Sequence, residues 1–217
     1  TVNITGHTDS KMYNGKEQSV TDYDVTTSNG LYTTNDFEFK GTAKAAGTDA
    51  GDYAMGLKAS DFTNTSKNFS KVKFVIVDGT LTIEKRTVIM TSASQNKVYD
   101  GKALTNKDVT ETGDGFVKGE GASYDVTGSQ TNVGKSDNEF TYKLNKDTSK
   151  DNYTIETNKG TLEVTPVTTA VKVTIKENGG TFKYDGEKKT VTGYTVKAIT
   201  NPLYTEDDFT FGGTASV

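Results

Sequence analysis

Apolar and polar residues alternate along much of this chain with a period of two. In residues 140–145, Phe, Tyr and Leu alternate with Thr, Lys and Asn, and residues 171–176 alternate Val or Ile with Lys or Thr. This period is typical of a β-strand with one buried and one solvated face. The run Val72–Val77 is apolar on both faces apart from Lys73, which predicts a central strand.

Asx-Gly and Asn-rich steps separate several of these apolar runs. Asp78-Gly79 precedes Leu81–Ile83, and Asn158–Gly160 lies between two apolar segments in the same way. Such steps favour tight turns between antiparallel strands, because glycine readily adopts positive φ. Both sites are therefore predicted to be hairpins. Helix signals are few: residues 59–68 could form a helical turn, but Thr and Ser there are poor helix formers.

A Tyr-Asx-Gly triplet recurs at nearly constant spacing. It occurs as Tyr13-Asn14-Gly15, Tyr99-Asp100-Gly101 and Tyr184-Asp185-Gly186, with separations of 86 and 85 residues. The turn-forming Asx-Gly step is expected to let the preceding tyrosine pack back across the turn. A fixed period of this kind indicates a tandem array of similar units.

The repeat extends beyond the triplet. The first copy carries Val2, Ile4, Tyr13, Gly15, Val20, Tyr23, Val25, Leu31, Tyr32, Phe37, Phe39, Gly41 and Ala43, and the third carries Val173, Ile175, Tyr184, Gly186, Val191, Tyr194, Val196, Leu203, Tyr204, Phe209, Phe211, Gly213 and Ala215. We place repeat 1 at residues 1–86, repeat 2 at 87–168 and a partial repeat 3 at 169–217. The third copy covers about the first half of a unit, which suggests a section of a longer array.

The sequence therefore predicts an all-β chain of tandem small antiparallel β domains in an elongated arrangement. Each domain is expected to be sandwich-like or β-grasp-like, with at most one short helix per repeat. Units of roughly 80 residues bury only about 60% of their unfolded surface, so each is expected to lean on adjacent repeats of the same chain. Eleven Tyr and ten Phe, with no Trp, indicate aromatic cores.

Composition excludes several function classes. The net charge of −4 is spread along the chain with no Lys/Arg stripe, which argues against nucleic-acid binding. No apolar stretch approaches the roughly 18 residues of a membrane span. Cysteine is absent, which removes disulfides and Cys-based metal sites and fits extracellular proteins of Gram-positive bacteria. A monomer is expected.

Several short motifs together resemble a known family. Besides the triplets, these are Asn132-Val133-Gly134, Asn152–Ile155 and Gly160–Pro166. The pattern is similar to the YDG and MBG-type repeats of bacterial cell-surface proteins and is strongest in repeat 2. Repeat 1 departs from it with Asn14 in the triplet and Glu84-Lys85 where Thr-Pro would stand. The resemblance implies an extracellular, wall-attached protein with a stalk or adhesin role, and it brings no catalytic residues.

Candidate chemistry is sparse. His7, the only histidine, lies in a turn beside Asp9, and an exposed loop position is favoured over a catalytic one. An enzyme is not expected. Acidic clusters that could in principle bind calcium are Asp49 with Asp52, and Glu206 with Asp207 and Asp208. Solvated turns are the favoured alternative for these carboxylates, and no cofactor is expected.

Two functional interpretations follow for the repeats. The favoured one is a stalk or spacer that projects a binding head from the cell wall. The alternative is that the repeats themselves bind a host glycan or protein through exposed aromatic rings, for which the candidates are Tyr23, Tyr32, Tyr194 and Tyr204. Packing within the fold would explain the recurrence of these tyrosines equally well. A Lys–Asn cross-link could replace disulfides, but no motif identifies one.

Overall fold

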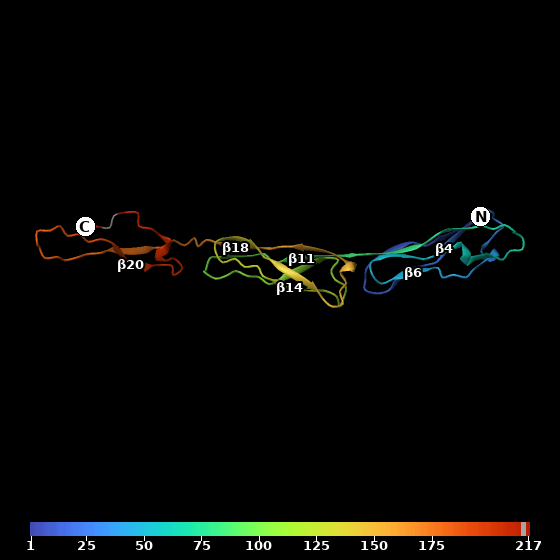
Figure 1. Ribbon diagram of the computed structural model, residues 1–217, viewed down its shortest axis with the longest axis horizontal. Coiled ribbons are helices and arrows are strands. Elements are labelled where there is room, and N and C mark those ends of the chain that lie inside the picture. The colour runs from blue at the N-terminus through green and yellow to red at the C-terminus, as the bar shows by residue number, and fades with distance from the viewer. Residues whose placement is uncertain (214–215) are drawn as a thin grey trace. The chain divides into compact units, whose positions relative to one another are not determined.

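The computed structural model describes residues 1–213 and 216–217 (Figure 1). Ala215 of the repeat pattern lies outside the described residues. The described chain is all-β, as the alternation predicts, and its helical segments are three-residue 3-10 turns. It comprises two compact units: unit 1 is made of residues 1–93, 107–127 and 138–160, and unit 2 of residues 94–106, 128–137 and 161–217.

Unit 1 holds most of the strands. Its elements are β1 (Val2–Gly6), β2 (Asp9–Met12), β3 (Gln18–Thr21), β4 (Tyr23–Thr27), η1 (Thr34–Asp36), β5 (Phe37–Phe39), β6 (Lys44–Gly47), β7 (Gly51–Ala54), η2 (Ala59–Asp61), β8 (Phe62–Asn64), β9 (Phe74–Val77), β10 (Thr80–Glu84), β11 (Arg86–Ser92), β13 (Val109–Gly113), β14 (Ala122–Val126), β16 (Phe140–Leu144), η3 (Lys150–Asn152) and β17 (Tyr153–Asn158). They form sheets ordered β4-β1-β9, β2-β10-β7 and β13-β11-β17, with smaller pairs β3-β6, β5-β8 and β14-β16.

Parallel strand pairs accompany the antiparallel ones. β1 pairs with β9 in parallel, and β2, the next strand along, pairs in parallel with β10. In repeat 2, β11 pairs with β17 in the same way. Among the described residues, each strand pair joins strands of one predicted repeat. The repeats therefore contain parallel as well as the predicted antiparallel strand pairs. The parallel pairs join the first and last strands of a repeat, which are far apart in the sequence.

The predicted central strand and hairpin at the end of repeat 1 are wrong. β9 is the edge of the sheet β4-β1-β9, and Val77 on it is 57% exposed. β9 and β10 do not pair with each other; they follow one another along β1 and β2. Gly79 follows β9 and packs closely against the segment that follows β1, because a Cβ there would overlap the carbonyl oxygen of His7 and lie 2.8 Å from the carbonyl carbon of Gly6. Glycine serves close approach here, not a hairpin turn.

The corresponding hairpin predicted at Asn158–Gly160 is also wrong. β17 pairs with β11, whereas the strand that follows it, β18 (Thr161–Thr165), pairs with β12 (Gln95–Val98) and β15 (Gly134–Asp137). The strand predicted at residues 140–145 is confirmed as β16.

The core of unit 1 is aromatic and aliphatic, as the composition predicts. Ile4, Leu81 and Met90 are fully buried, and Phe62 stacks against Phe39 with ring centroids 4.7 Å apart. Such buried rings supply most of the apolar area in a small domain.

Unit 2 contains β12, β15, β18, β19 (Val173–Glu177), β20 (Tyr194–Ile199) and η4 (Glu206–Asp208). Its sheets are β12-β18-β15 and the pair β19-β20. Leu104, Leu162 and Val164 form its buried cluster, with Tyr99 packed against it.

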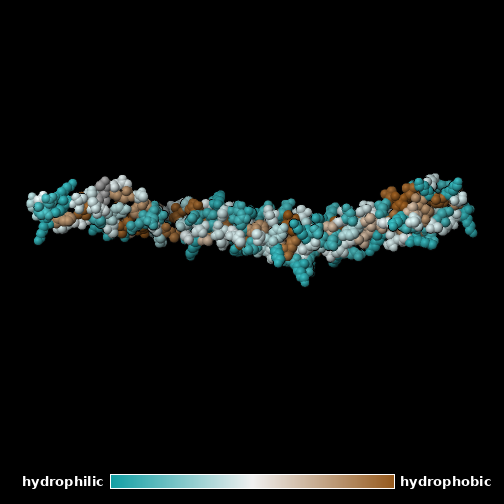
Figure 2. All heavy atoms as spheres, viewed as in Figure 1, coloured by the Kyte–Doolittle hydropathy of each residue, from teal (hydrophilic) through white to brown (hydrophobic). Residues whose placement is uncertain are grey.

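Polar and hydrophobic residues are interspersed on the face seen in Figure 2. Within residues 1–213 and 216–217, the structure contains no helix with the length and apolar character needed to cross a membrane.

Candidate inter-repeat joints

The three Tyr-Asx-Gly triplets adopt one turn conformation. Gly15, Gly101 and Gly186 have φ values of 74°, 75° and 78°. In each triplet the Asx Oδ1 accepts a hydrogen bond from the backbone N–H two residues later, at 2.9, 2.9 and 3.0 Å. Positive φ at the third position explains the recurrence of glycine, and the Asx side chain fixes the turn.

In unit 1 the first triplet contacts repeat 2 through a shared carboxylate. The Tyr13 hydroxyl donates to Glu120 Oε1 at 2.6 Å, and the Tyr153 hydroxyl donates to Glu120 Oε2 at 2.8 Å. The Tyr153 oxygen also accepts the backbone N–H of Val117 at 3.1 Å. Hydrogen bonds to an ionised carboxylate are the stronger kind, and here one carboxylate joins residues of both repeats.

Apolar contacts surround this carboxylate. The rings of Tyr13 and Tyr153 meet edge to face with centroids 5.7 Å apart, and Phe116 packs edge-on to Tyr153 at 5.0 Å. A Cβ built on Gly15 would lie 2.9 Å from Val117 Cγ1, so the triplet backbone lies directly against repeat 2. The Tyr13 hydroxyl lies 3.9 Å from that same Cβ position, which fits the predicted packing back across the turn. Tyr13 is only 5% exposed.

We call the contact between two consecutive repeats a joint. The joint between repeats 1 and 2 also contains polar contacts. Asn152, 1% exposed, accepts the Ala50 N–H at 2.7 Å and donates to Asp49 Oδ1 at 2.9 Å. Arg86 is the first residue of β11, a strand of repeat 2. Its Nε–H donates to Gly115 O at 2.8 Å, and its Nη1 lies 3.5 Å from Tyr13 O. Repeats 1 and 2 are therefore joined inside unit 1 by charged, amide and aromatic contacts.

Both phenols of this joint are held neutral. Burial, then the hydrogen bond and charge of Glu120, raises the pKa of Tyr13 well above its ordinary value. Burial raises the pKa of Tyr153 to about 12, with Glu120 adding to the rise and the Val117 N–H opposing it. Neutral phenols can donate to Glu120 throughout the neutral and mildly alkaline range.

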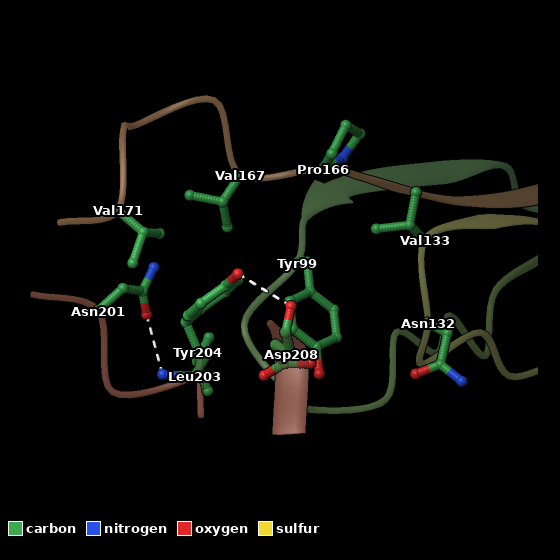
Figure 3. A pocket seen from close by; sticks show the side chains of 10 residues that line it. All are labelled: Tyr99, Asn132, Val133, Pro166, Val167, Val171, Asn201, Leu203, Tyr204 and Asp208. Atoms are coloured by element: carbon green, nitrogen blue, oxygen red, sulfur yellow. Dashed lines mark hydrogen bonds between the residues drawn. The ribbon is translucent and has the colours of Figure 1, made fainter. Parts of the chain in front are cut away.

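The second triplet lies in a similar joint within unit 2 (Figure 3). A cavity of about 440 Å³ is bounded there by residues of repeat 2, among them Tyr99 and Pro166, and of repeat 3, among them Val171, Leu203 and Tyr204. A Cβ built on Gly101 would lie 3.1 Å from Leu203 Cδ2. The triplet glycine thus faces an aliphatic side chain of the next repeat in both joints.

The backbone N–H of the first two triplet tyrosines is held by the last strand of their own repeat. Tyr13 N donates to Glu84 O at 2.9 Å, and Tyr99 N donates to Thr165 O at 2.8 Å. Tyr99 is half-buried, in contrast to the buried Tyr13, so the second joint is the more open one. Tyr184 of the third triplet is 98% exposed.

The tyrosines proposed for ligand binding pack against phenylalanines. Tyr23 meets Phe39 edge to face at 5.2 Å between centroids, and Tyr32 is only 5% exposed and stacks with Phe37 at 6.5 Å. Tyr204 stacks with Phe209 at 6.2 Å, and Tyr194 meets Phe211 at 5.1 Å. Their recurrence is explained by packing, and binding of a host glycan or protein stays a prediction from the sequence.

The candidate calcium ligands use oxygens in hydrogen bonds within the protein. Asp49 accepts from Asn152, and Asp52 Oδ1 accepts the Thr82 hydroxyl at 2.6 Å. Glu206, Asp207 and Asp208 form η4, in which Asp208 Oδ2 accepts the Thr205 N–H at 2.7 Å. Across the part of the chain that the structure describes, no group of three or more His, Cys, Asp or Glu residues is placed to hold a metal ion.

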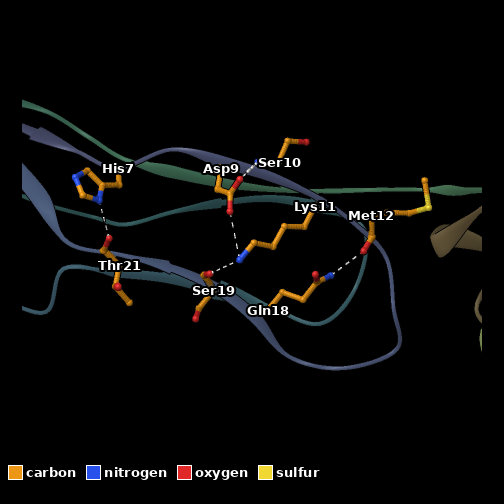
Figure 4. A network of polar contacts seen from close by, with 8 residues as sticks. All are labelled: His7, Asp9, Ser10, Lys11, Met12, Gln18, Ser19 and Thr21. Atoms are coloured by element: carbon orange, nitrogen blue, oxygen red, sulfur yellow. Dashed lines mark hydrogen bonds and ion pairs between the residues drawn. The ribbon is translucent and has the colours of Figure 1, made fainter.

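His7 takes part in a network of surface contacts (Figure 4). Its Nδ1 lies 3.0 Å from Thr21 O, and its Nε2 lies 3.4 Å from Asp24 Oδ1. Asp9, its neighbour in sequence, instead pairs with Lys11 Nζ at 3.3 Å. The His7 side chain is 42% exposed, and its contacts tie β1 and β2 to β3 and β4.

Residues 1–85 match the family model described as the MBG domain. Repeat 1 is an MBG domain. The resemblance inferred from the triplets and the accompanying short motifs is thereby confirmed for this part of the chain. No match was found among curated proteins or solved structures. The Tyr13 triplet lies within the MBG domain and supplies its contact to repeat 2.

The partners of the triplet were not found from the sequence. Glu120 lies in the first half of repeat 2, where the repeat pattern has diverged, whereas Asn152 and Tyr153 lie in the Asn152–Ile155 motif, which did not indicate a contact with the triplet. Glu120 lies between Gly119 and Gly121 in a glycine-rich segment that also holds Asp114, so the sequence there resembles an ordinary solvated turn.

Proposed function

We propose that these repeats act as a structural spacer of an extracellular bacterial surface protein, between the cell wall and a binding head. In this proposal the repeats are not an enzyme, and their task is to keep consecutive domains at a defined separation. The MBG match of residues 1–85 supports a structural role of this kind.

The observation that carries the proposal is the contact of Tyr13 and Tyr153 with Glu120. A spacer requires that successive domains be coupled, since freely jointed domains would fold back on one another. The carboxylate, the edge-to-face rings and the Asn152 amide supply this coupling for repeats 1 and 2. The triplet, which is the most regular feature of the sequence, supplies one half of the contact.

The length that one repeat contributes follows from its strands. β1 and β2 together cover residues 2–12 and run beside β9 and β10. At about 3.3 Å per residue, this path is roughly 35 Å long.

Small-angle scattering on chains of increasing repeat number tests the proposal. Extra copies of residues 87–168 would be inserted after residue 168, so that each added joint sets the Tyr99 triplet of one copy against the Glu120 end of the next. The maximum dimension is expected to rise by a constant roughly 35 Å for each copy. A maximum dimension that levels off as copies are added would contradict a spacer.

A further inference from the structure

The methionines of the chain differ sharply in exposure. Met90 is fully buried and Met55 is 7% exposed, whereas Met12 is 43% exposed. The sequence has three methionines and no cysteine, so its sulfur atoms are all thioethers. Met12 carries the one among them that is most accessible from solvent.

Met12 is the last residue of β2 and directly precedes the first triplet. Its backbone is fixed by the register with Glu84 of β10 and by Gln18, whose Nε2 donates to Met12 O at 3.0 Å. Figure 4 shows the Met12 side chain pointing away from Lys11 and Gln18. The polar network of β2 therefore fixes the backbone of Met12 and leaves its thioether outside the network.

A guanidinium of the joint between repeats 1 and 2 contacts this thioether. Arg86 Nη1 donates to Met12 Sδ at 3.7 Å. The same side chain donates to the backbone oxygens of Gly115 and Asp114 and lies against that of Tyr13. These contacts hold the planar guanidinium in place, so Arg86 is a fixed donor beside an exposed sulfur.

Hydrogen peroxide oxidises exposed thioethers to sulfoxides. A lone pair of the sulfur attacks one peroxide oxygen, the O–O bond breaks, and the other oxygen leaves as water after taking up the proton of the transferred one. The sulfur is oxidised by two electrons and the peroxide is reduced. Methionine sulfoxide reductases reverse the change.

A sulfoxide oxygen at Met12 would be a better acceptor for Arg86 than the sulfur. A thioether sulfur accepts hydrogen bonds weakly. A hydrogen bond from a guanidinium to an oxygen is charge-assisted and about twice as strong as a neutral one. Methionine rotates about three side-chain bonds, so the oxygen can turn toward Arg86 Nη1 and reach an ordinary N–H···O distance of about 2.9 Å.

We infer that Met12 is a reversible oxidation site in the joint between repeats 1 and 2, and that Arg86 binds the sulfoxide oxygen. Sulfoxide formation commonly disrupts packing, but here it keeps the joint closed, because the new polar group has a donor waiting for it. Repeat 2 has Val98 at the position of Met12, so the site belongs to the first joint alone of these two.

Dilute hydrogen peroxide, followed by peptide mapping with mass spectrometry, tests the site. In the folded chain, one oxygen atom should be added at Met12 and none at Met55 or Met90. The control Met12→Val carries the residue of repeat 2 and should take up no oxygen under the same conditions. The chain unfolded in urea should be oxidised at all three methionines. Oxidation of Met90 in the folded chain as fast as that of Met12 would overturn the site.

Urea denaturation of the reduced and oxidised proteins tests the role of Arg86. Arg86→Leu keeps an aliphatic stem and removes the donors, and circular dichroism checks that it is folded. The urea midpoint should hold or rise when the wild type is oxidised and should fall when Arg86→Leu is oxidised. A fall in the wild type, or equal shifts in the two proteins, would contradict binding of the oxygen by Arg86.

Nuclear magnetic resonance of the Arg86 guanidinium gives a readout in the wild-type chain itself. Its resonances should shift on oxidation and return after treatment with methionine sulfoxide reductase, and they should not shift in peroxide-treated Met12→Val. Unchanged resonances in the oxidised wild type would overturn the inference. The proposed spacer function would survive, because it rests on the contact of Tyr13 and Tyr153 with Glu120.

Discussion

The hydroxyl of Tyr13 lies 2.6 Å from a carboxylate oxygen of Glu120, although the two residues are 107 positions apart in sequence. Tyr153 donates to the other oxygen of the same carboxylate. Because Tyr13 opens the recurring triplet, the most regular motif of the sequence marks a contact between repeats.

Tyr13→Phe should lower the free energy of unfolding of unit 1 by about 1.5–3 kcal/mol, the usual contribution of a hydrogen bond to a charged group. The ring contacts with Tyr153 are kept, so the change isolates the loss of the hydroxyl. Urea denaturation measures it. Tyr184→Phe is the control, since that side chain is 98% exposed and should change stability by less than about 0.5 kcal/mol. Equal effects of the two changes would contradict the joint.

Stability should fall in alkaline solution through the phenols of the joint. A phenol whose pKa rises on folding favours the folded state while neutral, so its contribution is complete below the unfolded pKa of about 10. For Tyr153 that contribution is lost as the pH rises from about 10 through about 12, and for Tyr13 the loss also begins near pH 10.

Urea denaturation at pH 9 and pH 11 checks this loss. Burial and Glu111 also raise the pKa of Tyr124, which contributes a loss of its own. The double variant Tyr13→Phe with Tyr153→Phe keeps Tyr124 and should lose less stability between the two pH values than the wild type. If it loses as much, the phenols of the joint are not responsible.

Gly79→Ala should destabilise repeat 1 by about 1–3 kcal/mol, the usual cost of overpacking. A Cβ at Gly79 would overlap the His7 carbonyl and force β1 and β9 apart. Gly30→Ala is the control, because nothing lies within 4 Å of the Cβ it would add. Thermal unfolding followed by circular dichroism compares them, and a Gly79→Ala variant as stable as Gly30→Ala would refute the close approach.

Asn152→Ala should lower the free energy of unfolding by about 1–3 kcal/mol, because it leaves the half-buried Ala50 N–H without the acceptor that the buried Asn152 side chain supplies. Asn158→Ala, at an exposed position of β17, is the matched control and should be nearly neutral. Chemical denaturation of both variants measures the difference. No difference would mean that the amide is replaced by water.

The sequence predicted the β class, the strand at residues 140–145 and the turns of the triplets because these depend on local chemistry. Period-two alternation and glycine at positive φ are readable without knowing the fold. The parallel pairing of β1 with β9 was missed, since it joins residues 72 positions apart that no local rule connects. For the same reason Gly79 was assigned to a hairpin, although it serves the close approach of two neighbouring strands.

The candidate site was predicted only in part. The triplet and the Asn152–Ile155 motif were found, but Glu120 and the contact between them were not, because an interface between repeats depends on residues that need not recur in every copy. The four tyrosines suggested as ligand contacts illustrate the opposite case. They recur because each packs on a phenylalanine of its own repeat.

The central claim is that Glu120 couples repeats 1 and 2. The chain has no native cysteine, so spin labels can be placed uniquely at Lys40→Cys in repeat 1 and Lys143→Cys in repeat 2, both exposed. Pulsed electron–electron double resonance then measures the distribution of distances between the two spin labels. If Glu120 couples the repeats, the distance distribution should be narrow, should broaden in Glu120→Ala and should stay narrow in Glu120→Gln, which keeps an acceptor oxygen. A distribution that is already broad in the labelled parent, or unchanged by Glu120→Ala, would contradict it.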